Sequence, residues 1–200
     1  MARATKEESE KTAQQILEIA TDHFRQRGYG GTDLVTVASD SGVTRGAIYH
    51  HFASKKALFE AVVSGLHKQL QDRIEREAAS HDDLWEQLVA GCEACIDAAL
   101  DPAVRQILLV EAPAVLGWEA WRSMDEATSF ASLTDVLKQL AAAGDIVETN
   151  IDAAARLLSG AMNEAVLWIA SAEQPEHARS QAIETLAMMV RSLKRSSDSA

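Results

Sequence analysis

Two parts of the sequence contain side chains whose types and spacing could do chemistry: residues 44–55, and the pair Cys92 and Cys95. Residues 44–55 combine hydroxyl groups, histidines, an arginine and a lysine, which are the groups that bind phosphate oxygens and base edges of nucleic acids. Catalytic motifs are missing: the histidines form no H-E-x-x-H pair, the serines no G-x-S-x-G turn and the glycines no phosphate-binding loop. The sequence therefore predicts a binding protein and not an enzyme.

The C-x-x-C spacing of Cys92 and Cys95 is compatible with redox chemistry, metal binding or simple packing. Redox chemistry favours this motif at a helix N-terminus that follows a strand, where the helix dipole lowers the pKa of a thiol. Structural zinc requires four ligands, and the chain has no second cysteine pair. We therefore expect two small buried thiols, with a redox or thiol-reactive sensor as the alternative, and neither a metal nor a cofactor.

Residues Asp33 to Phe52 have the pattern of a helix-turn-helix. Helices are expected at 33–40 and 45–51, and the segment Ser41-Gly42-Val43-Thr44 joins them. In this turn the glycine ends one helix, the valine packs inward and the threonine caps the next helix. Because the second helix begins with small and polar residues, it can enter a DNA major groove, where Arg45 can reach base edges or phosphates.

Apolar residues at helical spacing predict further helices on both sides of this motif, at 12–28 and 54–79. Gly28 is the expected end of the first, Thr32 the N-cap of the helix at 33–40, and Ser54 the N-cap of the helix that ends near Ala79. The same spacing predicts five more helical stretches, at 82–100, 103–112, 117–142, 152–171 and 175–194. Alternation at period two is absent, so we expect an all-α fold of about nine helices.

These elements divide the chain into four expected parts. They are a flexible N-terminal arm (1–11), a helix-turn-helix domain (12–72), a larger helical domain (73–195) and a disordered tail (196–200). Residues 1–70 carry a net charge of +1 and residues 71–200 one of −12, so the acidic excess lies outside the helix-turn-helix part. This asymmetry removes the objection that an acidic protein should not bind nucleic acid.

Composition bounds the class of protein. With 200 residues, of which 47% are hydrophobic and 24% charged, the chain is too short for an elaborate multidomain enzyme and too apolar to be disordered. No run of about eighteen apolar residues occurs, and no apolar segment follows the first charged residues. We therefore expect a cytoplasmic protein without a membrane span or a secretory signal.

Four short features occur together in residues 28–59: Thr32, Gly42-Val43-Thr44, Tyr49-His50-His51-Phe52 and Ser54-Lys55. In this combination the segment resembles the DNA-binding domain of TetR/AcrR-family transcriptional regulators. That family has a threonine that opens helix two, a Gly-Val-Ser/Thr turn, a Tyr-x-His-Phe segment and a Ser-Lys start to helix four. The resemblance implies an N-terminal DNA-binding domain of three helices, followed by a larger ligand-binding and dimerisation domain.

The resemblance also implies two roles for side chains in this segment. The residues that it places on phosphates are Thr32, Thr44, Tyr49 and Lys55. The residues that it places along the major groove are Arg45, Gly46, Ala47 and His50. Hydroxyls, a lysine and helix N-termini suit phosphate contacts, although the two threonines can also be plain helix caps. We expect His51 and Phe52 to pack inward, and the basic residues of the arm (Arg3, Lys6 and Lys11) to be solvated or to bind the minor groove.

All four tryptophans lie in the C-terminal part, near polar residues that interrupt apolar runs. This combination suits a pocket for a flat apolar ligand with a polar handle, although aromatics at helical spacing also form ordinary cores. The residues expected to line the pocket are Trp85, Glu111, Trp118, Trp121, Met124, Met162 and Asn163. Glu111 could attract a cationic ligand, and the alternative is a buried carboxylate paired with Arg105 or Arg122.

The last two helical stretches carry more apolar surface than one inward face requires. In the TetR/AcrR family these two helices form a four-helix dimer interface, and the residue pattern fits that role. The interface is therefore expected at Leu158, Ala161, Ala165, Ile183, Leu186 and Val190. Packing inside a single subunit is the alternative.

Together these features predict a homodimeric transcriptional regulator that binds double-stranded DNA. The first hypothesis is a repressor that a small apolar or aromatic effector releases from a palindromic operator. The alternative is a DNA-binding regulator with no small-molecule site, controlled by a partner protein. A cavity lined by the tryptophans would favour the first, and a solid core with an exposed apolar patch the second.

Overall fold

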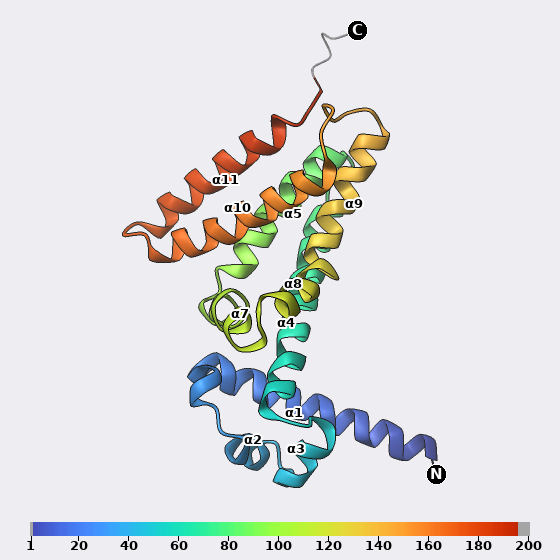
Figure 1. The fold of residues 1–200 in the computed structure, drawn as a ribbon, viewed down its shortest axis with the longest axis vertical. Coiled ribbons are helices and arrows are strands. Elements are labelled where there is room, and N and C mark those ends of the chain that lie inside the picture. The colour runs from blue at the N-terminus through green and yellow to red at the C-terminus, as the bar shows by residue number, and fades with distance from the viewer. Residues whose placement is uncertain (1, 196–200) are drawn as a thin grey trace. The chain divides into compact units, whose positions relative to one another are not determined.

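Eleven α-helices and one π-helical segment account for most of residues 2–195, the part of the chain that the computed structural model describes (Figure 1). The first four are α1 (Ala2–Gly31), α2 (Leu34–Asp40), α3 (Arg45–His51) and α4 (Lys55–Ala78). The others are α5 (Leu84–Ala99), α6 (Pro102–Arg105), η1 (Gln106–Glu111), α7 (Ala112–Leu116), α8 (Trp118–Glu126), α9 (Ser129–Ala142), α10 (Ile151–Ser171) and α11 (Pro175–Arg191). The expectation of an all-α fold is confirmed, and the tail expected at 196–200 lies outside the described residues.

Two compact units divide the chain. The first contains the chain up to Leu66 together with Gln106–Trp121, and the second contains His67–Arg105 and the residues from Arg122 onward. The boundary near residue 66 lies close to the expected one at 72. However, residues 106–121, which we assigned to the C-terminal domain, group with the helix-turn-helix. In the described residues, no helix is both long and apolar enough to cross a membrane.

The N-terminal residues correct one expectation, because α1 begins at Ala2 and residues 2–11 are helical instead of forming a flexible arm. Charged side chains one turn apart stabilise this exposed segment: Nζ of Lys6 lies 3.7 Å from Oε1 of Glu10, and Nζ of Lys11 lies 3.5 Å from Oε1 of Glu7. Pairs at this spacing each contribute about 0.2–0.5 kcal/mol to a helix. Lys6 and Lys11 are thus paired with acids on their own helix.

The core of the first unit draws side chains from each of its first four helices, of which the following are examples. Fully buried side chains come from α1 (Ile16 and Phe24), α2 (Val37), α3 (Ile48) and α4 (Phe59). Each such side chain stabilises the fold by about 1.5–3 kcal/mol relative to leaving it in water. Because α2 and α3 are only seven residues long, they depend on this shared core and not on their own helical propensity.

In the second unit α5, α9, α10 and α11 pack along one another, and α10 and α11 form an antiparallel hairpin (Figure 1). The expected stretch 117–142 proves to be two helices, since α8 ends at Glu126 and α9 begins at Ser129. Between them Thr128 leaves helical geometry, and its hydroxyl donates to the carbonyl of Met124 at 2.9 Å. No glycine or proline marks this break. This break adds one helix to the nine expected, and the division of the expected stretch 103–112 into α6, η1 and α7 adds the others.

Cys92 and Cys95 lie in the middle of α5 and are free thiols. Burial raises the pKa of both thiols to about 12, so both are protonated at neutral pH. A protonated thiol is a poor nucleophile. The structure therefore supports the expectation of two packed thiols over that of a redox sensor.

Candidate nucleic-acid interface

The turn between α2 and α3 has the hydrogen bonds of a tight helix-turn-helix. Oδ1 of Asp33 accepts from the backbone N of Val35 at 3.0 Å and caps α2. At the other end the backbone N of Val43 donates to the carbonyl of Ala38 at 3.0 Å. Gly42 between them has φ +66°, a left-handed conformation that residues other than glycine adopt at a cost.

Two side chains of α1 hold this turn in place. Nε2 of His23, which is buried, lies 2.8 Å from Oδ2 of Asp40 at the end of α2. Nε2 of Gln15 donates to the carbonyl of Ser41 at 3.0 Å. The turn is therefore fixed on α1 by polar contacts in addition to the shared core.

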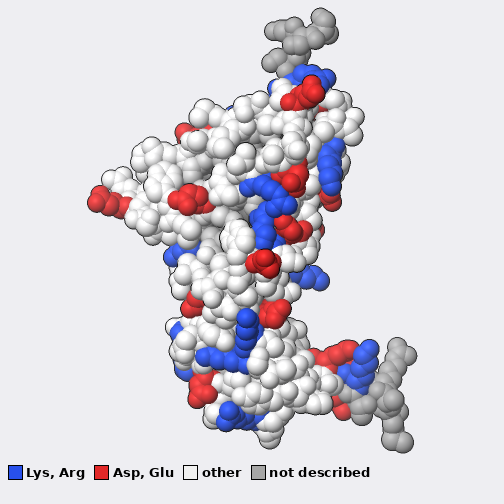
Figure 2. Space-filling model, viewed as in Figure 1, with Lys and Arg blue, Asp and Glu red and all other residues white. Residues whose placement is uncertain are grey.

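Helix α3 has one buried and one exposed face. Its N-cap is Thr44, whose Oγ1 accepts from the backbone N of Ala47 at 3.2 Å, as the sequence predicted. Ile48 is fully buried against the other helices. On the opposite side the exposed residues are Arg45, Gly46, Tyr49 and His50. On the face shown in Figure 2, the surface over α2 and α3 is mostly uncharged and carries a basic group and an acidic group.

Arg45 and Tyr49 are one turn apart on the exposed face and contact each other. Nη2 of Arg45 donates to the hydroxyl of Tyr49 at 3.3 Å, and the guanidinium carbon lies 5.4 Å from the centre of the tyrosine ring. This hydrogen bond raises the pKa of Arg45 further, so the guanidinium is charged at every accessible pH. The pair presents a cation and a hydroxyl side by side, which are the groups that phosphates and base edges accept.

Lys55 lies at the first turn of α4, which Ser54 caps through a hydrogen bond from the backbone N of Ala57 to its Oγ at 3.0 Å. Nζ of Lys55 lies 4.7 Å from the centre of the Tyr29 ring and 3.5 Å from the carbonyl oxygen of Gly30. Lys55 is half-buried, and two neighbours contact its ammonium group. Free backbone N–H groups at the start of a helix favour an anion at the same place.

Thr32 corrects two expectations. Its side chain is only 3% exposed, and its hydroxyl donates to the carbonyl of Gly28 at 2.8 Å. Asp33, and not Thr32, caps α2. The threonine therefore closes the turn after α1 and is not available to a phosphate in this structure.

His51 and Phe52, expected inside, are half-buried at the end of α3, where Ile48 supplies the core contact instead.

Gly46 provides a test of whether α3 approaches DNA. A methyl group at this position would meet only Oγ1 of Thr44, at 3.7 Å, so the fold itself has room for it. We expect Gly46→Ala to leave the melting temperature unchanged or higher, because alanine favours helix by up to about 1 kcal/mol. Operator affinity should fall roughly tenfold, since overpacking a close contact costs about 1–3 kcal/mol.

Gly65→Ala is the matched control, because Gly65 lies exposed in α4 with open space around it. It should keep normal operator affinity. Thermal melts and operator titrations of the two variants decide the matter. Normal affinity of Gly46→Ala would show that DNA does not come close to this residue.

The residues expected to line a ligand pocket belong to both units. In the second unit Trp85 and Met162 are buried, and Met124 and Asn163 are half-buried. In the first unit Trp121 is buried, Trp118 is 63% exposed, and their rings lie 4.9 Å apart. The expectation that Trp118 is part of an enclosed wall is therefore not met.

Glu111 also differs from expectation. Neither Arg105 nor Arg122 pairs with it: Arg122 binds Oδ2 of Asp125 at 2.8 Å, and Arg105 donates to the carbonyl of Leu100. Instead Oε2 of Glu111 accepts from the backbone N of Tyr29 at 2.9 Å. The carboxylate thus belongs to the helix-turn-helix unit.

His67, which we did not single out, is the most unusual polar residue of the second unit. It is 3% exposed, and neither ring nitrogen has a hydrogen-bond partner among the described residues. The sequence held a signal, because His67 occupies an apolar position of the repeat that contains Val63, Leu70 and Ile74.

The residues expected at a dimer interface have three different environments. Leu158 and Val190 are buried inside their own subunit, so their assignment to the interface is wrong in this structure. Ile183 lines a narrow cleft whose other residues include Val89 and Cys92 of α5. Ala161, Ala165 and Leu186 line an open groove between α10 and α11, although Leu186 is itself only 6% exposed.

Comparisons with known proteins agree with this architecture. The family model "Bacterial regulatory proteins, tetR family" matches residues 16–62, and the model "Tetracyclin repressor-like, C-terminal domain" matches residues 85–193. The HTH-type transcriptional regulator TtgR of Pseudomonas putida is 43% identical over 84 residues, which are 42% of this chain and 40% of TtgR. AcrR of Shigella flexneri is 48% identical over 62 residues, which are 31% of this chain and 29% of AcrR. The alignments thus span less than half of these curated relatives.

Solved structures cover nearly the whole chain. A TetR-family transcriptional regulator from Pectobacterium atrosepticum has a TM-score of 0.78 and 31% identity, covering 94% of this chain and 97% of that one. The regulator FadR of Bacillus subtilis, solved in complex with stearoyl-CoA, shares the fold with a TM-score of 0.72 at 18% identity, covering 87% of this chain and 97% of FadR. These relatives are regulators and not enzymes. With one family model over its N-terminal helices and another over more than half of its length, the chain belongs to the TetR family of bacterial transcriptional regulators.

Proposed function

We propose that this protein is a homodimeric repressor that binds a palindromic operator and is released from it by a small apolar or aromatic effector. The observation that carries the DNA-binding part is the exposed face of α3. Arg45, Gly46, Tyr49 and His50 have no packing role in the subunit, whereas Ile48 on the opposite face is fully buried. A short helix that is rigidly held and presents small and polar groups outward fits a DNA major groove.

The proposed DNA contacts are of two kinds, those with base edges and those with phosphates. Arg45 is the candidate reader of a base edge, because its guanidinium can donate two parallel hydrogen bonds to a guanine. Thr44, Tyr49 and Lys55 supply a hydroxyl, a phenol and an ammonium group for phosphates, which position the protein without reading sequence. Gly46 and Ala47 keep the start of α3 small, so that the backbone can come close.

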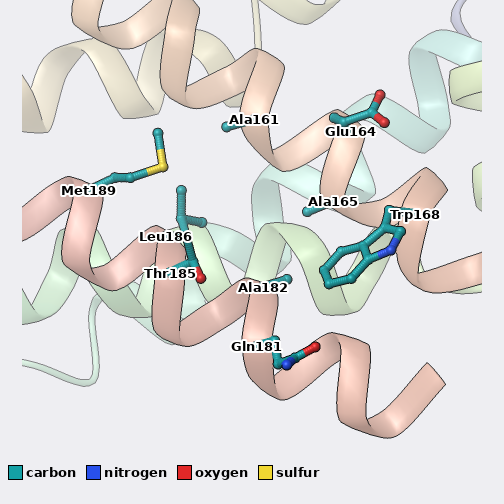
Figure 3. Close-up of a pocket in the computed structure, with 9 residues that line it drawn as sticks. All are labelled: Ala161, Glu164, Ala165, Trp168, Gln181, Ala182, Thr185, Leu186 and Met189. Atoms are coloured by element: carbon teal, nitrogen blue, oxygen red, sulfur yellow. The ribbon is translucent and has the colours of Figure 1, made fainter. Parts of the chain in front are cut away.

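For the dimer, we propose that a second copy of the chain covers α10 and α11. Their outer surface carries exposed apolar side chains that no element of the subunit covers, including Leu157 (72% exposed), Trp168 (44%) and Met188 (63%). Between the helices is a groove of about 550 Å³, with Ala161, Ala165 and Trp168 on the α10 side and Thr185, Leu186 and Met189 on the α11 side (Figure 3). The visible surface over these two helices is mostly uncharged (Figure 2).

A two-fold dimer requires a palindromic site, with half-sites one helical turn of DNA or a multiple apart. Selection of bound fragments from a random DNA pool tests this directly. Enriched inverted repeats at such a spacing would support the proposal. Enrichment of a single half-site, or of no sequence, would refute it.

Buried polar atoms support an effector site in the second unit. Nδ1 and Nε2 of His67 and Nε1 of Trp85 have no hydrogen-bond partner among the described residues. Buried polar groups are nearly always satisfied, so each of these atoms is a candidate contact for a polar group of a ligand. FadR of Bacillus subtilis, which shares this fold, was solved in complex with stearoyl-CoA, a ligand with a long apolar chain.

The rival proposal is control by a partner protein, and the exposed indole of Trp118 favours it, because interfaces are enriched in tryptophan. A compound screen with purified protein on its selected operator separates the two. Release of DNA by an apolar compound, with a matching rise in melting temperature, supports the effector. If no compound acts and a protein from the same cell releases the DNA, control by a partner is correct.

A further inference from the structure

We propose that Glu111 is a positioning residue for DNA binding: its carboxylate holds the turn at residues 28–30, and this turn orients the ammonium group of Lys55. The inference rests on the proposed contact of Lys55 with a phosphate. It concerns the first unit only, in which Gln106–Trp121 and the helix-turn-helix lie together. It gives a role in DNA binding to a residue 56 positions beyond Lys55 in the chain.

The first link joins Glu111 to the break in α1. At Gly28 the backbone leaves helical geometry, with φ +67° and ψ 177°, and the following N–H group, that of Tyr29, donates to Oε2 of Glu111 at 2.9 Å. The carbonyl of Gly28 accepts from the hydroxyl of Thr32 at 2.8 Å. Both sides of the break are therefore bound by side chains, one from Thr32 inside the turn and the other from Glu111, which is distant in the sequence.

The fit at Gly28 is tight as well as polar. A Cβ atom at this position would collide with Oε1 of Glu111. The carboxylate thus lies directly against the glycine backbone, with one oxygen on the N–H of Tyr29 and the other beside Gly28. A carboxylate that accepts from a backbone N–H makes a charge-assisted hydrogen bond, which is stronger than one between neutral groups.

The second link joins the turn to Lys55. The ring of Tyr29 lies 5.0 Å from that of Phe59 and 6.2 Å from that of Phe24, centre to centre, so the core holds it on one side. On the other side Nζ of Lys55 lies 4.7 Å from the ring centre and 3.5 Å from the carbonyl oxygen of Gly30. Both contacts of the ammonium group come from the segment whose backbone Glu111 binds.

The two links lead to an effect on one phosphate contact. Without the carboxylate, the N–H of Tyr29 loses its acceptor and the turn can shift, which moves the ring and the carbonyl that orient Lys55. The lysine keeps its charge and loses its fixed position. DNA binding should then behave as though one phosphate contact were missing from each helix-turn-helix domain of the dimer.

The salt dependence of operator binding is the test. Each neutralised phosphate contributes a slope of about −0.9 to the plot of log K against log salt. The variant Glu111→Met fills the space without accepting a hydrogen bond. We expect it to weaken operator binding roughly tenfold and to make the slope less steep by about 0.9 for each helix-turn-helix domain of the dimer. Glu111→Gln retains an acceptor oxygen for the N–H of Tyr29 and should restore the wild-type slope.

Three comparisons make the result decisive. Glu119→Ala removes an exposed carboxylate from the same unit and should leave the slope unchanged. Lys55→Ala should reproduce the slope of Glu111→Met, and the double variant should show no further change. If Glu111→Met does not fold, judged by circular dichroism and cooperative melting, Glu111→Ala takes its place.

Loss of affinity with an unchanged slope would overturn the inference, because a merely structural residue lowers the fraction of competent protein and not the number of phosphates bound. If Lys55→Ala flattens the slope and Glu111→Met does not, the inference also fails while the phosphate contact stands. If Lys55→Ala itself leaves the slope unchanged, the proposed phosphate contact is wrong and the inference fails with it.

Discussion

A Met188→Glu, Leu157→Glu double variant is expected to be a folded monomer that binds its operator on the order of a hundredfold more weakly, or not at all. Both side chains are largely exposed on the outer surface of α10 and α11, so the subunit itself loses little packing. In a dimer, four unpaired carboxylates would enter an apolar interface, where each costs several kcal/mol. A single helix-turn-helix domain has too few phosphate contacts to bind DNA tightly at physiological salt. In the monomer, no second domain is linked to it to strengthen binding.

Sedimentation, helical content and operator titration together measure this prediction. Val147→Glu is the matched control, since Val147 is an exposed valine of the second unit outside α10 and α11 and should leave the dimer intact. If the double variant still sediments as a dimer and binds normally, α10 and α11 are not the interface. The DNA-binding proposal would then stand without the dimer proposal.

The choice of residues in this experiment follows from the tertiary structure. Charges at Leu158 or Val190 would lie inside the subunit, where both side chains are buried, and are expected to unfold the second unit. Loss of operator binding in such variants would say nothing about dimerisation. Residues one position away, such as Leu157 and Met189, point outward and give an interpretable result.

A second large effect is expected from pH, through His67. Burial lowers the pKa of His67 to about 4, from an ordinary value of 6.5. Between pH 6.5 and pH 4 the unfolded chain therefore binds a proton at His67 that the folded chain does not bind. The contribution of His67 to the free energy of unfolding, which is highest above pH 6.5, decreases as the pH falls through this range toward 4. At pH 5 the free energy of unfolding should be lower than at pH 7.5 by about 2 kcal/mol from this residue.

His67→Leu should remove this contribution, so its stability should fall less than that of the wild type between pH 7.5 and pH 5. Denaturant unfolding at a series of pH values measures the difference. His177→Leu, at an exposed histidine of α11, should follow the wild-type curve. Parallel curves for His67→Leu and the wild type would show that His67 is solvated or paired in solution.

The helix-turn-helix was predictable from sequence because its signals are local. The glycine at Gly42, the cap at Thr44 and the cap at Ser54 act within a few residues of where they stand, and the structure confirms each of them. The break between α8 and α9 was not predictable, because neither glycine nor proline is present and three neighbouring residues, Asp125, Thr128 and Ser129, could each cap a helix. Its geometry depends on packing.

The assignment of helix faces shows the limit of periodicity. Apolar residues on α10 and α11 nearly surround each helix, so spacing alone cannot tell the inward stripe from the outward one. Leu158 and Val190 are therefore expected outside although they are core, whereas Leu157, Met188 and Met189, which are exposed, are not among the residues expected at the interface. Only the packing of α10 against α5 and α9 determines which stripe remains exposed.

Sequence by itself determined the helical class, the position of the helix-turn-helix and the family, since these follow from short-range spacing and from motifs that lie within about thirty residues of one another. Tertiary structure decided which polar groups meet. The hydroxyl of Thr32 is committed to the carbonyl of Gly28, and Glu111 binds a backbone N–H that is 82 residues away. A contact over such a separation leaves no periodic trace in the chain, because it depends on how η1 and α1 pack and not on the neighbours of either residue.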